Sequence, residues 1–137
     1  MNHGHKGEFE VEIRLINFSG PLNDRQYEQI IQTFQELAES GVKRLVVNLK
    51  DVPFIDSRGL AALVTGFKLF GCRPDNFRLA ELQCQPKLVF ELTGFDYIFE
   101  IFDSVAEVAE IEPNIRLEFD SGLPVTGILF NAPAINI

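Results

Sequence analysis

A carboxylate, a hydroxyl and a guanidinium follow one another in the segment 56–59, Asp-Ser-Arg-Gly. The segment comes after an apolar run at 45–49, which is bounded by turn formers and is short enough to be a buried strand. It precedes four apolar residues at helical spacing: Leu60, Leu63, Val64 and Phe67. Ser57 therefore lies where a strand ends and a helix begins. The unpaired N–H groups and the positive dipole end of such a helix favour an anion.

The simplest interpretation of Ser57 is a helix N-cap, because Ser and Asp are preferred there and stabilise a helix by about 1 kcal/mol. A nucleophilic serine needs an adjacent base and an oxyanion hole, but the two histidines, His3 and His5, lie close to the start of the chain. The acidic residues lack the spacing of a calcium loop, and no glycine-rich phosphate loop is present. We therefore expect no enzyme activity and no catalytic, metal-binding or cofactor-binding residue.

The bulk composition favours one globular domain with protein partners. The chain has 137 residues, 46% of them hydrophobic, and a formal charge of −8, which argues against nucleic acid or an anionic membrane as the main partner. The N-terminus has no signal-peptide pattern, and no apolar run approaches the roughly 20 residues that span a bilayer. Cys72 and Cys84 have neither a C-x-x-C spacing nor a secretory context, which predicts free thiols. We expect a cytoplasmic protein without direct membrane insertion.

The hydrophobic pattern alternates between strands and helices. Strands are expected over five segments: 9–18, 44–50, 77–82, 97–102 and, at an edge, 116–119. Helices are expected over four segments: one from Tyr27 to a C′ glycine at Gly41, one over 57–71, one from near Pro86 to Gly94, and one over 104–111. In the third of these helices, Leu88, Val89 and Leu92 share one face. Such alternation implies right-handed crossovers and a mostly parallel sheet.

The outer face of the helix at 57–71 is unusual, because it is small or apolar beyond its first residue. If the four apolar residues point inward, a step of 100° per residue places the opposite face at Arg58, Ala62, Thr65 and Leu69. One interpretation is that the apolar C-terminal segment of the chain covers this face. The other is a partner surface beside Ser57.

Four motifs, in order along residues 8–111, resemble the STAS domain, the fold of bacterial anti-sigma factor antagonists: FSGPLN at 18–23, VVNL at 46–49, FIDSRGL at 54–60 and LTGF at 92–95. In that family the third motif usually reads Asp-Ser-Ser-Gly-Leu, and its first serine is the phosphoacceptor. That position falls on Ser57. The resemblance implies an α/β, STAS-like fold: a small, mostly parallel sheet with helices packed mainly on one side. We expect the first strand to pair antiparallel at an edge of that sheet.

The resemblance implies a signalling switch with no catalysis of its own. In the family, the unphosphorylated antagonist binds a serine kinase that sequesters a sigma factor. Phosphorylation by the kinase ends the binding, and a metal-dependent phosphatase restores it. The implied site consists of Ser57 as phosphoacceptor and these partner-binding residues: Asn23, Asp24, Asp56, Arg58, Gly59, Ala62, Thr65 and Leu69.

Two residues depart from the family pattern, and they keep a second function open. Arg58 replaces the second serine of the motif, and Asn23 stands where antagonists commonly have an aspartate that helps engage the kinase, although Asp24 follows. STAS adaptors that are never phosphorylated, such as stressosome scaffolds and lipid-transport ABC subunits, are therefore the alternative. We expect a monomer or weak homodimer with a flexible N-terminus at 1–7, a STAS-like domain at 8–111 and a C-terminal extension of unknown role at 112–137.

Overall fold

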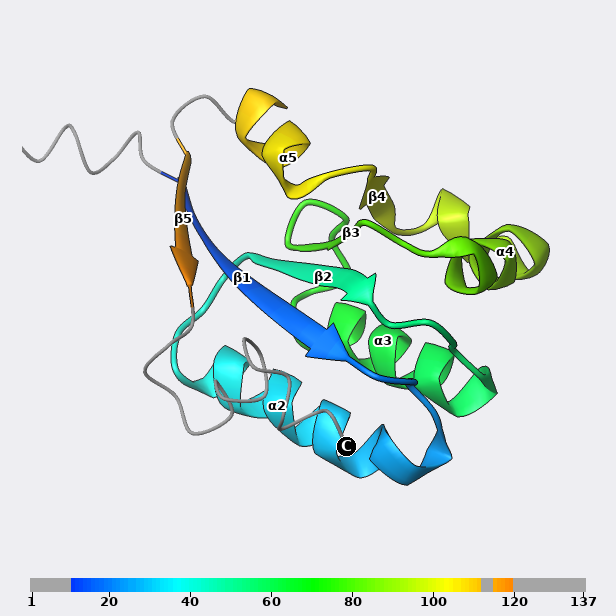
Figure 1. Cartoon of the computed structure of the whole chain (residues 1–137). Helices are drawn as coiled ribbons and strands as arrows, with labels where there is room; N and C mark the ends of the chain where they lie inside the picture. The colour runs from blue at the N-terminus through cyan, green and yellow to red at the C-terminus, as the bar shows by residue number, and fades with distance from the viewer. Residues whose placement is uncertain (1–10, 112–114, 120–137) are drawn as a thin grey trace, which may run out of the picture.

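The computed structural model describes residues 11–111 and 115–119, which form one parallel sheet with helices on both faces (Figure 1). The strands are β1 (Val11–Ser19), β2 (Leu45–Asp51), β3 (Phe77–Ala80), β4 (Glu100–Phe102) and β5 (Ile115–Phe119). The helices are α2 (Tyr27–Glu39), α3 (Ser57–Leu69), α4 (Cys84–Thr93) and α5 (Val105–Ile111), with short 3-10 turns η1 (Asp24–Gln26) and η2 (Phe95–Tyr97). The predicted flexible segment 1–7 and most of the extension 112–137 lie outside the described residues.

The sheet has the strand order β4-β3-β2-β1-β5, and every neighbouring pair is parallel. The prediction that the first strand pairs antiparallel at an edge is therefore wrong. The crossover through α2 brings β2 back parallel to β1, as helical crossovers do. On the other side of β1, β5 adds the predicted edge strand, with Val11 paired to Ile115 and Leu15 to Phe119.

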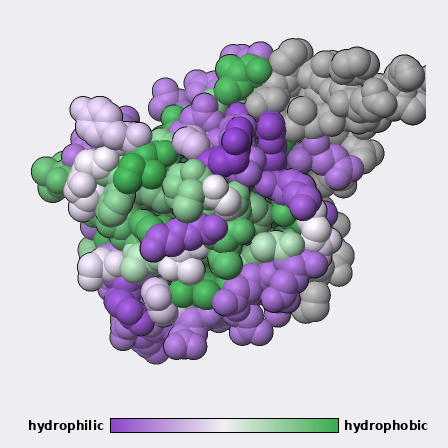
Figure 2. Space-filling view, turned by 180° about the vertical axis from the view of Figure 1, so that it is seen from behind, coloured by the Kyte–Doolittle hydropathy of each residue, from purple (hydrophilic) through white to green (hydrophobic). Residues whose placement is uncertain are grey.

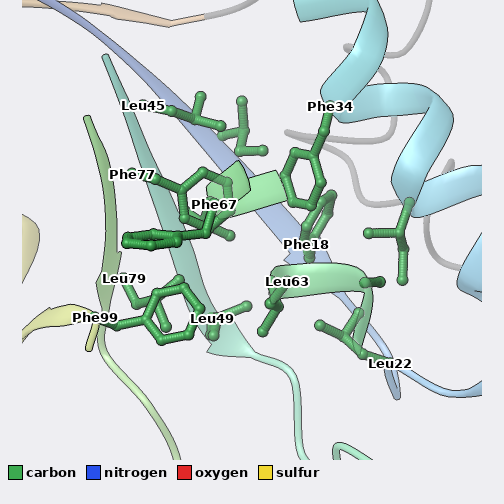
Figure 3. Packing of buried hydrophobic residues seen from close by; sticks show 14 of the residues in the cluster. Phe18, Leu22, Phe34, Leu45, Leu49, Leu63, Phe67, Phe77, Leu79 and Phe99 are labelled. Atoms are coloured by element: carbon green, nitrogen blue, oxygen red, sulfur yellow. The ribbon is translucent and has the colours of Figure 1, made fainter. Parts of the chain in front are cut away.

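Phenylalanine rings fill the main core between the sheet and the helices α2, α3 and α4. The rings of Phe34 and Phe77 lie 5.1 Å apart between centroids, and the rings of Phe67 and Phe99 are equally close. Phe90 of α4 contacts Phe99 at 5.4 Å and joins that helix to the same core. Figure 3 shows Phe34 of α2, Phe67 of α3, Phe77 of β3 and Phe99, which precedes β4, gathered in this core. Most helices thus pack on one face, as predicted, while α5 covers a smaller cluster around Val108 on the other.

Two predictions about the fourth helix and the fourth strand need correction. On α4 the buried residues are Pro86 and Phe90. Of the predicted apolar face only Val89 packs against the core, whereas Leu88 and Leu92 are 51% and 77% exposed. The strand predicted at 97–102 is shorter and is preceded by η2, because Gly94 adopts φ 82° and turns the chain after α4.

The turn between α3 and β3 is fastened by charged side chains. Asp75 accepts a hydrogen bond from Arg44 at 3.3 Å and lies 3.4 Å from Arg73. Burial alone raises the pKa of Asp75. The hydrogen bond and charge of Arg73, together with the charge of Arg44, outweigh it, so the pKa lies below its ordinary value of 3.8.

Candidate functional site

Ser57 is the first residue of α3, and the residue before it caps the helix. The carboxylate of Asp56 accepts a hydrogen bond from the N–H of Gly59 at 2.8 Å, and its backbone carbonyl accepts from the N–H of Leu60 at 2.9 Å. The simple interpretation of Ser57 as the N-cap is therefore wrong, because Asp56 has that role. The Ser57 side chain is exposed, and within the described part of the chain its hydroxyl has no hydrogen-bond partner.

Two backbone N–H groups at the start of α3 are also available. The N–H groups of Asp56 and Gly59 each donate a hydrogen bond, but those of Ser57 and Arg58 have no acceptor among residues 11–111 and 115–119. These N–H groups lie at the positive end of the helix dipole. An added negative charge on the Ser57 oxygen would therefore meet a favourable electrostatic environment.

The loop before Ser57 is held by Leu22 on one side. The N–H of Leu22 donates to the carbonyl of Phe54 at 2.9 Å, and the N–H of Asp56 donates back to the carbonyl of Leu22 at 3.1 Å. Leu22 and Ile55 thus form an isolated parallel bridge beyond the ends of β1 and β2. A Cβ on Gly59 would lie only 2.1 Å from the carbonyl oxygen of Leu22. This close approach explains why the motif requires glycine at this position.

Gln85 at the start of α4 holds the same loop from the other side, a contact that the sequence did not predict. Its side chain accepts a hydrogen bond from the N–H of Ile55 at 2.8 Å and donates to the carbonyl of Ile55 at 3.0 Å. Glutamine is common at helix surfaces, and the contact spans 30 residues of sequence. No local signal could have revealed it.

Arg58 connects α3 to the segment before α2. Its Nε lies 3.1 Å from Oδ1 of Asp24, and its guanidinium carbon lies 3.7 Å from the ring centroid of Tyr27. Asn23 caps η1, because its side-chain oxygen accepts from the N–H of Arg25 at 3.0 Å. The structure therefore brings Asn23 and Asp24 to the start of α3, where the sequence analysis placed the site.

The small residues of α3 have a different role from the one predicted. Ala62 is fully buried, so its placement on the outer face is wrong. Gly59, Ala62 and Gly66 follow at helical spacing, and Gly59 and Gly66 lie directly against Leu22 and Phe34. Small residues on this stripe let neighbouring segments approach α3 closely. Gly59, which was also predicted to bind a partner, is buried as well.

The two remaining predicted residues lie farther along α3. Thr65 is half-buried, and its hydroxyl donates to the carbonyl of Ala61 at 3.0 Å. Leu69 is 40% exposed but ends the helix, about 18 Å along the axis from Ser57 at 1.5 Å per residue. The residues that surround Ser57 are therefore Asp56, Arg58 and Asp24, and the far end of α3 is a separate surface.

The helix α4 and the segment that follows it expose larger apolar side chains than the outer face of α3 does. Tyr97 is 91% exposed, and Leu92, Leu88 and Ile98 are also solvent-accessible. Seen from behind the view of Figure 1, apolar residues gather across the middle of the molecule with hydrophilic ones around them (Figure 2). The exposed apolar side chains of α4 and of the segment after it are therefore a candidate contact surface for another protein.

Among the described residues, no three His, Cys, Asp or Glu side chains lie close enough together to hold a metal ion. Over residues 11–111 and 115–119, no helix has the length and hydropathy that crossing a bilayer requires. Cys72 and Cys84 are free, as predicted, and both are exposed.

Comparison with known proteins places this geometry in a family. The family model described as the STAS domain matches residues 8–108. A proposed anti-sigma factor antagonist from Thermotoga maritima superposes with a TM-score of 0.65 at 24% identity, covering 72% of this chain and 87% of that one. The unphosphorylated anti-sigma factor antagonist SpoIIAA gives 0.55 at 19% identity, covering 72% and 86%. A sulfate transporter family protein from Wolinella succinogenes gives 0.63 at 16% identity, covering 74% and 84%. The predicted fold and the resemblance are confirmed.

Proposed function

The chain belongs to the STAS domain family, and we propose that it is a signalling protein of the anti-sigma factor antagonist type. In its unphosphorylated form it binds a serine kinase that also binds a sigma factor, and phosphorylation of Ser57 ends that binding. One observation carries the proposal: Asp56 caps α3, and the exposed Ser57 hydroxyl has no hydrogen bond to any residue that the structure describes. The structural similarity to anti-sigma factor antagonists supports this general class.

The phosphoryl transfer uses ATP as donor and needs no base from this chain. The Ser57 oxygen forms a bond to the terminal phosphorus of ATP, the bond from that phosphorus to ADP breaks, and the hydroxyl proton passes to a base of the kinase. This chain is thus a substrate and a binding protein, not an enzyme. A phosphatase of the partner system would hydrolyse the phosphoserine and return the chain to its binding form.

The phosphorylated domain should remain folded. A phosphoryl group adds about −1.5 to −2 charges at pH 7. At the first position of α3 this charge meets two available N–H groups and the helix dipole, whose interaction with an anion is favourable by about 0.3–1 kcal/mol. The complex, in contrast, would have to desolvate a doubly charged group or tolerate repulsion from acidic partner residues. A loss of only about 3 kcal/mol weakens binding more than a hundredfold.

The test is to produce the full chain with phosphoserine encoded at position 57 and to compare its melting temperature and partner affinity with those of the unmodified chain. The partner is first recovered by pull-down with the unphosphorylated chain. We expect melting to change little and affinity to fall at least a hundredfold. Ser40, the C-cap of α2, is exposed and provides a control for affinity alone, because phosphoserine there adds the same charge away from the site. Its melting temperature should fall, because the hydroxyl loses its hydrogen bond to the carbonyl of Leu37 and the phosphate faces the negative end of the helix dipole. Affinity that stays within a few-fold after phosphorylation at Ser57 would refute the switch.

A constitutive STAS adaptor is the second candidate, and one contact favours it. Antagonists commonly present an aspartate to the kinase at the position of Asn23, but here the Asn23 side chain caps η1 and the neighbouring Asp24 is paired with Arg58. An adaptor should co-purify with its partner whether or not phosphatase is added, and Ser57→Asp should leave its binding nearly intact. Recovery of a transporter subunit in the pull-down would support the adaptor, and recovery of a serine kinase would support the antagonist.

A further inference from the structure

Arg58, which replaces the second serine of the family motif, reaches from α3 to the turn that precedes α2. We propose that Arg58 is a positioning residue: it fastens the segment 23–26 to the first turn of α3, so that the two segments form one partner surface on which Asp24 is paired. This inference rests on the proposed function only where it calls that surface partner-facing. The fastening itself is a property of the isolated chain.

The guanidinium makes two different contacts at once. Its edge donates from Nε to the carboxylate of Asp24 at 3.1 Å, and its face lies 3.7 Å from the ring centroid of Tyr27. The Arg58 and Asp24 side chains are 49% and 75% exposed, so the ion pair alone is weak. Stacking on Tyr27 restricts the guanidinium and makes the pair more effective. A lysine could supply the charge but not the planar edge and face together.

The other side of the same turn is already fixed. Leu22 is bonded to the loop before α3 through both its N–H and its carbonyl, and Gly59 lies against that carbonyl. Asn23 then closes the turn by accepting from the N–H of Arg25 at 3.0 Å. The segment 23–26 is therefore held at its start by Leu22, and Arg58 provides the second point of attachment to α3.

Helix geometry directs Arg58 toward this turn and not toward its neighbour Ser57. Consecutive residues on a helix are separated by 100° and do not face each other. Because Asp24 and Tyr27 hold its guanidinium, the Arg58 side chain does not contact a phosphate on Ser57, which interacts with the backbone N–H groups instead. The pair thus presents Asp24 and Arg58 together on one surface.

Hydrogen exchange of the isolated full chain, measured by mass spectrometry, tests the fastening. We expect Arg58→Ala to accelerate exchange in the peptide covering 23–28 by about 2–5-fold, the factor that corresponds to 0.5–1 kcal/mol. Exchange in β2 and β3 should stay unchanged. Arg58→Lys should not restore the protection. Arg73→Ala is the matched control, since it removes another exposed arginine that pairs with an aspartate. Unchanged exchange in Arg58→Ala, or an equal effect of Arg73→Ala, would overturn the proposal.

A double-mutant cycle with the recovered partner separates positioning from direct contact. If Arg58 acts by holding the turn, Asp24→Ala and Arg58→Ala should each weaken binding, and the double variant should bind no more weakly than either alone. Additive losses would show that Arg58 contacts the partner independently, against the proposal.

Encoded phosphoserine at position 57 gives a further check. If it accelerates exchange at 23–28 to the level of Arg58→Ala, Arg58 has moved to the phosphate and the proposal is wrong. None of the exchange results depends on whether Ser57 is a natural phosphorylation site.

Discussion

Gly59→Ala is the sharpest test of how the site is built, because a single methyl group would collide with the backbone. Its Cβ would lie 2.1 Å from the carbonyl oxygen of Leu22 and 2.6 Å from the carbonyl carbon. The same carbonyl accepts the hydrogen bond from the N–H of Asp56. The clash can therefore be relieved only if the backbone at Leu22 or the first turn of α3 moves, and either shift strains that hydrogen bond.

The expected cost follows from two opposing effects. Adding a methyl group to a tightly packed site typically costs about 1–3 kcal/mol, and a clash with backbone atoms favours the upper end of that range. Alanine gains up to about 1 kcal/mol over glycine within a helix, which offsets part of the cost. The net destabilisation is then about 2 kcal/mol. For a domain of this size that corresponds to a fall in melting temperature of roughly 6–8 °C.

Thermal unfolding followed by circular dichroism measures this difference. Ser57→Ala is the matched control, because it changes an exposed residue of the same helical turn. An exposed substitution of this kind usually alters stability by at most about 0.5 kcal/mol, so the control should melt within about 2 °C of the parent chain. If Gly59→Ala melts as high as the control, Leu22 does not lie against Gly59, and the account of the glycine in this motif is wrong.

Two further predictions concern the residues that hold the loops. Gln85→Leu leaves the N–H and carbonyl of Ile55 without their partner, which should cost about 1–3 kcal/mol in chemical denaturation, whereas Gln83→Leu removes a solvent-exposed bond and should cost much less. Equal effects of the two would contradict this. Because the pKa of Asp75 is lowered in the folded state, its ion pairs stabilise the protein above the pKa of the unfolded chain, and that stabilisation is lost as the pH falls through the folded value. Asp75→Asn should thus lower the melting temperature by about 1–3 °C at pH 7 and by progressively less below about pH 4, and a constant difference would refute it.

The sequence predicted the elements around the site well, because their hydrophobic patterns are strong. The run at 45–49 and the helical spacing after Ser57 place a strand and a helix where the structure has β2 and α3. The position of β1 between β2 and β5 could not be predicted, because local alternation does not reveal which strands become neighbours. The burial of Ala62 was missed for a related reason. A small residue can mark a surface or a close contact, and only the packed neighbours decide between them.

The choice between Asp56 and Ser57 as the cap shows how a shift of one residue changes the chemistry of a site. Both residue types are good N-caps, and helix boundaries derived from sequence are uncertain by one or two positions. If Ser57 were the cap, its oxygen would accept a backbone N–H, and phosphorylation would have to disrupt the start of the helix. Because Asp56 accepts that hydrogen bond at 2.8 Å, the helix start is complete without Ser57. Leu22 and Gln85 then hold the loop from both sides. A phosphoryl group could therefore be added to the Ser57 hydroxyl while the backbone around it keeps its hydrogen bonds. A phosphorylation switch that works without unfolding requires this.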